Sequence, residues 1–202
     1  MEGNWENIYH LPLGNICDAN GKGGNMDAGI KSLDTRCKLA GPAFTVKGHA
    51  GDNLAIHRAI YEAPKGSVLV VDVAGYCLAG HFGEIMALAC MEQDIAGLVI
   101  DGAVRDAYDM QELAFPVFSR GFNPGGTGKE YAGVTGGAII CGGVCVHAGD
   151  LIVGGRDGIV VVACADTERV LQGAQAIAKR ELEIADLLRS GKTTLEIFQF
   201  KK

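Results

Sequence analysis

The chain has 202 residues, enough for one domain of ordinary size with a sizeable hydrophobic core. Hydrophobic residues make up 48% and charged residues 21% of it, which argues against disorder. The formal net charge is -6 and no basic block is present, so we expect no nucleic-acid partner and no binding to an anionic membrane. Glycine, at 30 residues, is about twice as frequent as usual, which favours tight turns and close backbone packing.

The seven cysteines are odd in number and form no CxxC motif. Most lie in apolar runs, so we interpret them as small buried hydrophobic residues of a reduced compartment. The first ten residues contain no basic region followed by an apolar segment, and the longest uncharged stretch, 131–146, is interrupted by five glycines. These features predict no signal peptide, no membrane span and a cytoplasmic location.

In the first half of the chain, apolar runs typical of buried strands alternate with helical spacing of apolar residues. The predicted elements, in chain order, are a helix at 14–22 capped by Asn15, a strand at 42–48, a helix at 52–62 capped by Asp52 or Asn53, a strand at 67–73, a loop at 74–82, a helix at 83–93 and a strand at 96–100. The strands at 67–73 and 96–100 are apolar throughout, which is typical of strands covered on both faces.

The second half is richer in glycine turns and ends in a long amphipathic pattern. Its predicted elements are a short helix at 108–113, a strand at 116–119, a loop at 120–130, short strands at about 133–138, 144–146, 151–154 and 158–164, and a helix at 167–189. No linker divides the chain. The pattern therefore indicates a single mixed α/β domain with a β core covered by helices.

Several familiar motifs fail on their spacing. Residues 125–129 (GGTGK) resemble a phosphate-binding loop, but Glu130 follows Lys129 where that motif has Ser or Thr. No GxGxxG follows a predicted strand, and no GxSxG or Cys-His nucleophile pattern is present. The five histidines show no paired ligand spacing, so we expect each to be solvated or at the edge of the core rather than bound to zinc.

One candidate anion site lies at the start of the predicted helix 83–93. In an α/β unit, the loop after a strand and the start of the next helix face the same crevice. The N–H groups of the first helical turn and the helix dipole together suit a carboxylate, and Gly83 lets a ligand approach the backbone closely. The sequence predicts free N–H groups at Glu84, Ile85 and Met86.

Charged side chains follow the next predicted strand at the same crevice. Arg105 is a planar cation that can bind a carboxylate or an enolate oxygen. Asp106 and Glu84 offer hard oxygen ligands for Mg²⁺ or Mn²⁺, directly or through water. This combination can stabilise an enolate next to a carboxylate. From spacing alone, Arg105 and Asp106 could equally be a surface ion pair, and Glu84 a first-turn helix acid.

The spacing of the acidic and basic residues resembles a known signature: Glu84 is followed, after twenty residues, by Arg105 and Asp106. This pattern is similar to the acid-x20-Arg-Asp signature of the 4-hydroxy-4-methyl-2-oxoglutarate/4-carboxy-4-hydroxy-2-oxoadipate aldolases. These aldolases share a family with the RraA-type regulators of ribonuclease E. The stretch 97–106 (GLVIDGAVRD) is the most specific part of a resemblance that extends over about residues 12–198. It implies one RraA-like aldolase domain over 1–202, with an α/β/β/α sandwich fold of the swivelling type. It also implies a homotrimer or homohexamer whose sites lie between subunits.

The resemblance also implies roles for individual residues. Asp106 anchors the Mg²⁺ or Mn²⁺, and Arg105 contacts the keto or enolate oxygen of the bound 2-oxo acid. The Glu84 side chain orients water at the metal, although some aldolases have Asp at this position. Glu181 of a neighbouring subunit completes the site. The backbone that holds the substrate carboxylate belongs to Glu84, Ile85 and Met86.

The implied reaction cleaves the C3–C4 bond of a 4-hydroxy-2-oxo acid to pyruvate and a second oxo acid, with oxaloacetate decarboxylation as a side activity. It needs no Schiff-base lysine, and we expect no lysine in this group of residues. Two alternatives stay open: a non-enzymatic regulator of ribonuclease E, and a lyase for a sugar-derived 2-oxo acid. The regulators have Gln where this chain has Asp106, which favours the enzyme. Substrate-specific contacts are expected on loops 76–82 and 122–129.

Overall fold

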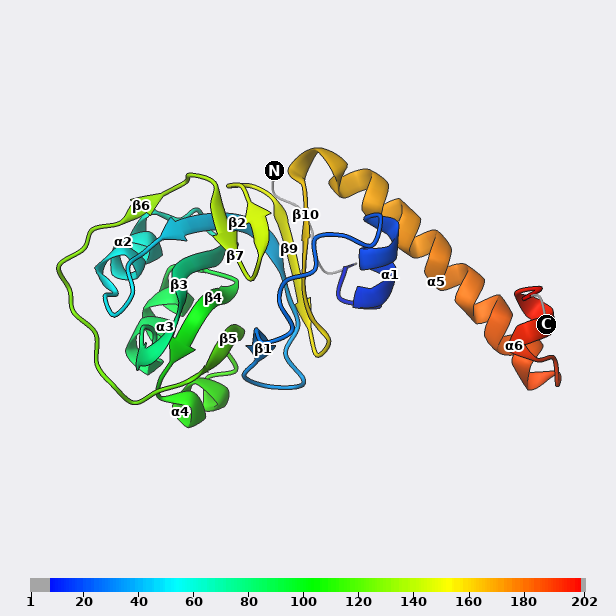
Figure 1. Cartoon of the computed structure of the whole chain (residues 1–202), viewed down its shortest axis with the longest axis horizontal. Coiled ribbons are helices and arrows are strands. Elements are labelled where there is room, and N and C mark those ends of the chain that lie inside the picture. Colours follow the sequence, from blue (N-terminus) through cyan, green and yellow to red (C-terminus); the bar gives the residue numbers. More distant parts are fainter. Residues whose placement is uncertain (1–7, 201–202) are drawn as a thin grey trace.

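Four parallel strands, formed by the most apolar runs of the chain, lie at the centre of the protein. In the computed structural model, which describes residues 8–200, they lie side by side in the order β5-β4-β3-β2 (Figure 1). Leu69 and Val70 pair with Leu98 and Val99 of the next strand, and all four side chains are fully buried. The strands are β2 (Leu39–Lys47), β3 (Val68–Gly80), β4 (Gly97–Val104) and β5 (Val117–Phe122).

Strand β2 belongs to two layers, because its two halves pair with different strands. Residues 39–42 run antiparallel to β9 (Leu151–Gly155), whereas residues 43–47 run parallel to β3. Strand β9 continues into β10 (Gly158–Val162) as an antiparallel pair. The two layers therefore share strand β2.

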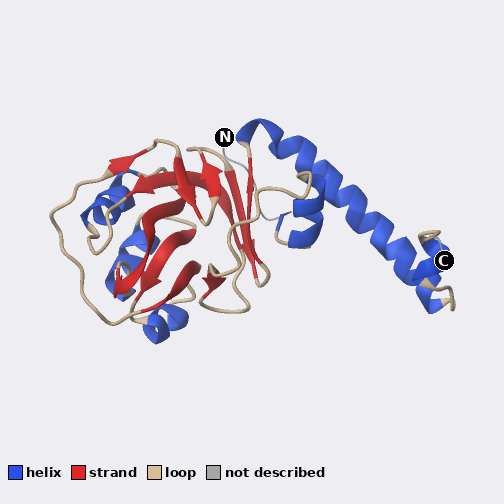
Figure 2. Ribbon diagram, viewed as in Figure 1, coloured by secondary structure: helices blue, strands red, loops and turns tan. Residues whose placement is uncertain are grey.

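Alternate side chains of these strands face opposite sides and fill three separate cores. Leu69 and Val71 pack against α2 and α3, while Val68 and Val70 pack against the β9–β10 layer. A third core lies between β9–β10 and helices α1 and α5. The result is the α/β/β/α sandwich that the family resemblance implies, with strands in the middle and helices outside (Figure 2). The helices are α1 (Leu13–Ala19), α2 (Leu54–Glu62), α3 (Glu84–Glu92), α4 (Ala107–Glu112) and α5 (Thr167–Arg189).

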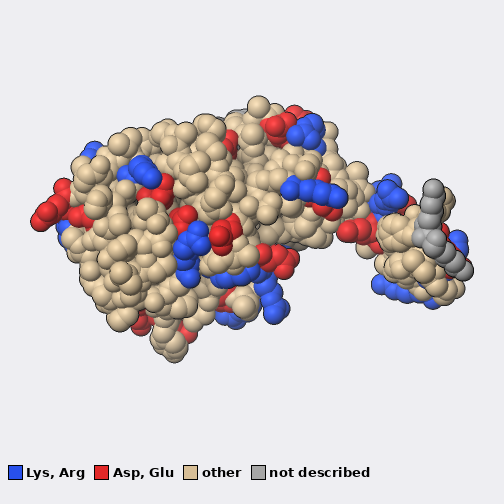
Figure 3. Space-filling model, viewed as in Figure 1, with Lys and Arg blue, Asp and Glu red and all other residues tan. Residues whose placement is uncertain are grey.

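Helix α5 buries apolar side chains against the body only in its first half, although Glu181 further along still accepts a hydrogen bond from Asn15 of α1. Val170 and Ala174 are its buried residues, and the second half projects away from the sandwich (Figure 1). No helix within residues 8–200 is long and apolar enough to cross a membrane. On the face drawn in Figure 3, basic side chains lie among acidic ones. The remaining short elements are β1 (Lys31–Ser32), β6 (Val134–Thr135), β7 (Ile139–Cys141), β8 (Val144–Val146), the 3₁₀ turn η2 (Cys164–Asp166) and α6 (Thr194–Ile197).

The structure confirms the predicted helix at 167–189 and corrects two local expectations. Helix α1 begins after Pro12, so Asn15 lies buried inside the helix and does not cap it. The expected loop at 74–82 is mostly strand, because β3 continues to Gly80 after a break in its register. Ala74 and Gly75 form that break with positive φ angles of 58° and 69°. Because these two residues resemble a turn in the sequence, the second half of the strand was not predicted.

The cysteines are free thiols, but they are not all buried. Cys145 and Cys164 are exposed, which contradicts their interpretation as core residues. Cys90 and Cys141 fit that interpretation, and burial raises the pKa of Cys90 to about 12. Cys90 therefore stays protonated and acts as a small apolar side chain.

Candidate active site

The candidate site forms where the segment before α3 lies beside the end of β4. The His81 N–H donates to the Ala103 carbonyl oxygen, and the Arg105 N–H donates to the Phe82 carbonyl oxygen, both at 2.9 Å. These hydrogen bonds align residues 80–83 with the end of β4. The first turn of α3 and the Arg105–Asp106 pair, which are far apart in sequence, therefore meet at one edge of the sheet.

Gly83, Arg105 and Asp106 are in close contact at this edge. Gly83 has an extended backbone, and an added Cβ would lie 2.3 Å from Asp106 Oδ2, so a side chain at this position would displace the carboxylate. Asp106 Oδ2 also lies 3.4 Å from Arg105 Nε. The Arg105 and Asp106 side chains are 46% and 39% exposed, so the pair is open to a ligand and contributes little to stability by itself.

Asp106 has a strained backbone and leaves its own helix uncapped. Its φ of 53° lies in the left-handed region, which costs a non-glycine residue about 1 kcal/mol or more. It occupies the N-cap position of α4, yet its carboxylate accepts no capping hydrogen bond. The carboxylate instead faces Gly83 and Arg105. Strain of this kind is typical of residues held in place for function.

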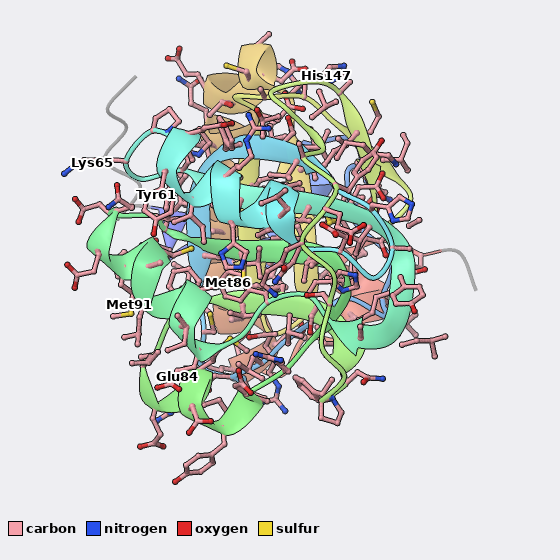
Figure 4. The ribbon with its side chains drawn as sticks, turned by 90° about the vertical axis from the view of Figure 1, so that its left-hand side faces the viewer. Tyr61, Lys65, Glu84, Met86, Met91 and His147 are labelled. Carbon is pink, nitrogen blue, oxygen red and sulfur yellow. The ribbon has the colours of Figure 1, made fainter. Side chains whose placement is uncertain are left out.

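The first turn of α3 offers two free N–H groups rather than three. Within residues 8–200, the N–H groups of Glu84 and Ile85 make no hydrogen bond, whereas Met86 N–H donates to the Gly83 carbonyl oxygen at 3.1 Å. Figure 4 labels Glu84 and Met86 on this turn. The Glu84 side chain is half-buried. The free N–H groups, with the helix dipole, are suited to one carboxylate.

A cavity of about 300 Å³ lies in front of Arg105 and Asp106. Gly83, Ile85 and Met86 also line it, whereas Glu84 does not. Lys129 is part of its wall, contrary to the expectation that no lysine lies near this site. Loops 76–82 and 122–129, on which the sequence predicts substrate contacts, both reach the cavity, through Gly80, His81, Phe82, Gly126, Thr127 and Lys129, whereas Asn53 and His57 were not expected there.

Asp52 fastens this loop to the start of α2. Its carboxylate accepts hydrogen bonds from the backbone N–H groups of Glu130 at 2.7 Å and Leu54 at 2.9 Å. Gly128 N–H donates to the Gly51 carbonyl oxygen at 2.8 Å. Burial pushes the pKa of Asp52 upward, but the hydrogen bonds from backbone N–H groups outweigh it and hold the pKa below its usual value. The anchored loop forms a fixed wall of the cavity.

Asn53 joins α2 to α3 instead of capping its own helix. It is the N-cap residue of α2 but makes no capping hydrogen bond. Its Nδ2 donates to the His81 carbonyl oxygen at 3.0 Å and lies 3.5 Å from Met86 Sδ. Its Oδ1 is buried and has no hydrogen-bond donor among the described residues, which costs about 1–3 kcal/mol.

Two histidines of the cavity wall are neutral near pH 7. His81 is fully buried; its Nε2 accepts the Gly51 N–H at 3.0 Å and its Nδ1 lies 3.3 Å from the Ala103 carbonyl oxygen. These partners assign the proton to Nδ1. Burial lowers the pKa of His81, and burial together with the charge of Lys129 lowers the pKa of His57.

The donors at the site fit a hard divalent cation that keeps water and substrate ligands. Asp106 provides a partly exposed carboxylate, and Glu84 directly follows Gly83, the residue that Asp106 contacts, on the first turn of α3. Among residues 8–200, no three His, Cys, Asp or Glu side chains gather into a ligand set. Mg²⁺ is commonly held by one or two carboxylates, water and substrate oxygens. Asp106 is therefore the residue that would hold such a cation.

Glu181 lies outside the cavity of its own chain. Its Oε2 accepts a hydrogen bond from Asn15 Nδ2 at 2.7 Å, which joins α5 to α1. These helices lie on the opposite side of the sandwich from α3 and α4 (Figure 1). A role for Glu181 in the site therefore requires a second copy of the chain.

The fold and the site together define an α/β/β/α protein with an anion site, an arginine and a carboxylate around one small cavity. The family described as "RraA-like: Aldolase/RraA" matches residues 14–161. The chain belongs to this family.

Named relatives include both enzymes and regulators. The chain is 39% identical over 165 residues to a "Putative 4-hydroxy-4-methyl-2-oxoglutarate aldolase" of Halalkalibacterium halodurans, covering 82% of this chain and 79% of the relative. A solved structure of an uncharacterized Pseudomonas syringae protein is 28% identical with a TM-score of 0.84, over 96% of both chains. The RNA-processing inhibitor RraA of Thermus thermophilis is 25% identical with a TM-score of 0.70, over 76% of this chain and 93% of that one.

The buried His81 predicts that the protein loses stability in mild acid. Its pKa is lowered in the folded state, so between that value and about 6.5 the unfolded chain binds more protons. The contribution of His81 to the free energy of unfolding is therefore greatest above about pH 6.5. As the pH decreases from there, the free energy of unfolding decreases by at most about 1.4 kcal/mol per pH unit for this group. Denaturant unfolding of the wild type and His81→Gln from pH 8 to 5 measures the difference.

The variant should show a flatter pH profile than the wild type, because glutamine does not titrate. His10→Gln, which changes an exposed histidine, is the matched control and should keep the wild-type slope. Parallel profiles for the wild type and His81→Gln would assign the acid sensitivity to other groups.

Proposed function

We propose that the protein is a divalent-metal-dependent (class II) aldolase. It cleaves a 4-hydroxy-2-oxo acid, such as 4-hydroxy-4-methyl-2-oxoglutarate or 4-carboxy-4-hydroxy-2-oxoadipate, to pyruvate and a second oxo acid, and it decarboxylates oxaloacetate as a side activity. The observation that carries this proposal is the contact of Arg105 and Asp106 with Gly83 at the start of α3. The name of the Halalkalibacterium halodurans relative supports the same reaction class.

In this proposal the substrate carboxylate binds the free N–H groups of Glu84 and Ile85. The neighbouring C2 keto oxygen then faces Arg105. When the C3–C4 bond breaks, the C4 hydroxyl gives its proton to a water molecule and becomes the carbonyl group of the second oxo acid, and the bonding electron pair moves toward the keto oxygen of the first, giving pyruvate enolate. Protonation of C3 from water then gives pyruvate. Arg105 stabilises the new negative charge with a planar, fixed cation. A cation bound at Asp106 supplies Lewis-acid polarisation of the 2-oxo acid.

Regulation of ribonuclease E is the second candidate function, supported by the similarity to RraA of Thermus thermophilis. The aspartate at position 106 favours the enzyme, since a carboxylate beside an arginine suits metal-assisted chemistry. A lyase for a sugar-derived 2-oxo acid uses the same groups, and an assay of pyruvate release over a panel of 2-oxo acids separates the three functions.

Arg105→Lys tests whether Arg105 stabilises the enolate. Lysine keeps the charge but loses the planar pair of donors, so turnover should fall about a hundredfold or more while folding is retained. KM should change less than kcat, because the contact strengthens in the transition state. Steady-state pyruvate release and thermal melts of the wild type, Arg105→Lys and Arg105→Ala measure both effects. Wild-type turnover in folded variants would make Arg105 a surface partner of Asp106 only.

Asp106→Ala and metal removal test the proposed cation site. Chelation should abolish pyruvate release, and added Mg²⁺ or Mn²⁺ should restore it. Asp106→Ala should lose Mn²⁺ binding, measured by electron paramagnetic resonance, together with activity. Asp109→Ala removes an exposed acid three residues further along and is the matched control. Full turnover after thorough chelation would contradict a metal-dependent reaction.

We also propose a homotrimer or homohexamer, in which α5 of one copy contacts its neighbour and brings Glu181 to the shared site. The projecting half of α5 supports this, since Leu182 is 69% exposed there. Leu195, Phe198 and Phe200, which lie beyond α5, are exposed too. A covered apolar surface on an oligomer is the common reason for such exposure.

Light scattering at micromolar concentration should give three or six times the mass of the chain. Leu182→Glu should lower that mass and the activity together, whereas Tyr61→Glu, at an equally exposed apolar residue of α2, should leave both unchanged. An active monomer would exclude a shared site.

A further inference from the structure

The end of β4 contains a bulge, where it has one residue more than the strand beside it. Between Ile100 and Ala103 the register of β4 with β5 shifts, so the two intervening residues of β4 lie opposite the single residue Arg120. A bulge of this kind interrupts backbone pairing and bends the strand, and bulges are common next to active sites. The chain runs from this bulge to Arg105 and Asp106, so the bulge decides where these two residues lie.

The backbones of the neighbouring strands do not fix the bulge. Strand β3 loses its register with β4 at the same place, with a break on either side of Tyr76, which pairs with Gly102. Strand β1 pairs with β5 at Phe118 and Ser119, so beyond Ser119 the only strand beside β5 within residues 8–200 is β4 itself. Side-chain contacts must therefore set the position of the bulge.

A buried ion pair spans the bulge. The Asp101 side chain is buried, and its Oδ1 accepts a hydrogen bond from Arg120 Nε. Its Oδ2 accepts the Gly142 N–H, in the turn between β7 and β8, at 2.8 Å. A terminal nitrogen of Arg120 also lies 3.4 Å from Asp27 Oδ1. The Asp101 carboxylate therefore joins the bulge of β4 both to β5 and to the β7–β8 turn.

The bulge lies directly before the hydrogen bonds that build the candidate site. The two bonds that join β4 to residues 80–83 use the Ala103 carbonyl oxygen and the Arg105 N–H, which lie within four residues of Asp101. A change in the bulge would therefore move both bonds, and Asp106 with them. A displacement of about 1 Å in a catalytic group can lower turnover by about a hundredfold.

We propose that Asp101 and Arg120 are positioning residues, which hold the bulge of β4 and thereby keep Arg105 and Asp106 in place for catalysis. Asp101 and Arg120 do not line the cavity of their own chain, so they act through the strand that carries the site. The inference rests on the proposed aldolase reaction, and it assigns a role to two residues outside the cavity.

Asp101→Asn tests the ion pair with a side chain of nearly the same size. Asparagine can still accept the Gly142 N–H but cannot neutralise Arg120, so the bulge should lose its position while the domain stays folded. The kcat for pyruvate release should fall about tenfold to a hundredfold, and KM should change less, because Arg105 is then misplaced for the transition state.

Variants of Arg120 test the same pair from its partly exposed side. Arg120→Met removes the cation and should lower kcat as Asp101→Asn does, which keeps the test decisive even if Asp101→Asn does not fold. Arg120→Lys keeps a cation beside Asp101 and should retain most of the turnover. Equal losses in Arg120→Lys and Arg120→Met would refute a role of the charge.

Two comparisons separate positioning from a purely structural contribution. Asp150 is a matched carboxylate, since it is 6% exposed against 7% for Asp101. It accepts the backbone N–H groups of His147 and Cys164, away from the cavity. Asp150→Asn should therefore lower the melting temperature but leave kcat unchanged. The double variant of Asp101→Asn and Arg105→Lys should be no slower than Arg105→Lys alone, because both changes affect one contact.

Hydrogen exchange measures the bulge independently of any reaction. In Asp101→Asn, the backbone amides of residues 102–106 should exchange about tenfold faster than in the wild type, whereas those of β9 and β10 should keep their rates. Wild-type exchange rates at residues 102–106 would show that the bulge does not depend on the ion pair, and would refute the proposal.

The kinetic outcomes distinguish this proposal from the proposed function. Wild-type kcat in folded Asp101→Asn and Arg120→Met would refute the positioning role while the aldolase reaction stands. Multiplied losses in the double variant would show that Asp101 does not act through Arg105. A wild type that releases no pyruvate from any 4-hydroxy-2-oxo acid would refute the proposed function, and the role of the pair in catalysis with it.

Discussion

The geometry of the candidate site depends on two backbone hydrogen bonds that join residues 80–83 to the end of β4. They run from His81 N–H to the Ala103 carbonyl oxygen and from Arg105 N–H to the Phe82 carbonyl oxygen. Backbone bonds of this kind do not depend on side-chain rotamers, so they fix the separation of the two segments. A side chain at Gly83 would displace the Asp106 carboxylate, which in turn lies 3.4 Å from Arg105 Nε. The N-terminus of α3, the Arg105 guanidinium and the Asp106 carboxylate therefore meet because the pairing of β3 with β4 continues to the end of β4.

The candidate site contains two energetically unfavourable groups, whereas the rest of the domain is well packed. Asp106 has a left-handed backbone, and Asn53 Oδ1 is buried without a donor. Each costs stability on the order of 1 kcal/mol or more. Three apolar cores, each between two layers, offset such costs in the rest of the domain.

Features that depend on local periodicity could be predicted from the sequence. The helix at 167–189 and the buried strands follow from apolar spacing, and the Arg105–Asp106 pair follows from its place after a strand. The second half of β3 could not be predicted, because Ala74 and Gly75 look like a turn and the pairing partner lies in β4. Loop 122–129 was expected to contact the substrate, but the sequence alone did not show that its Lys129 lies beside Arg105 and Asp106. The loop reaches the cavity through Asp52, which is 78 residues from Glu130 in sequence.

Strand β2 has a consequence for how the domain comes apart. Residues 39–42 pair with β9 and residues 43–47 pair with β3, so one strand is an integral part of both sheets. Neither layer can lose β2 without exposing apolar side chains of the other, which couples the cores on the two sides. One layer of the sandwich therefore cannot unfold while the other stays folded. It behaves as one cooperative unit, and the chain cannot be divided at β2 into two self-sufficient halves.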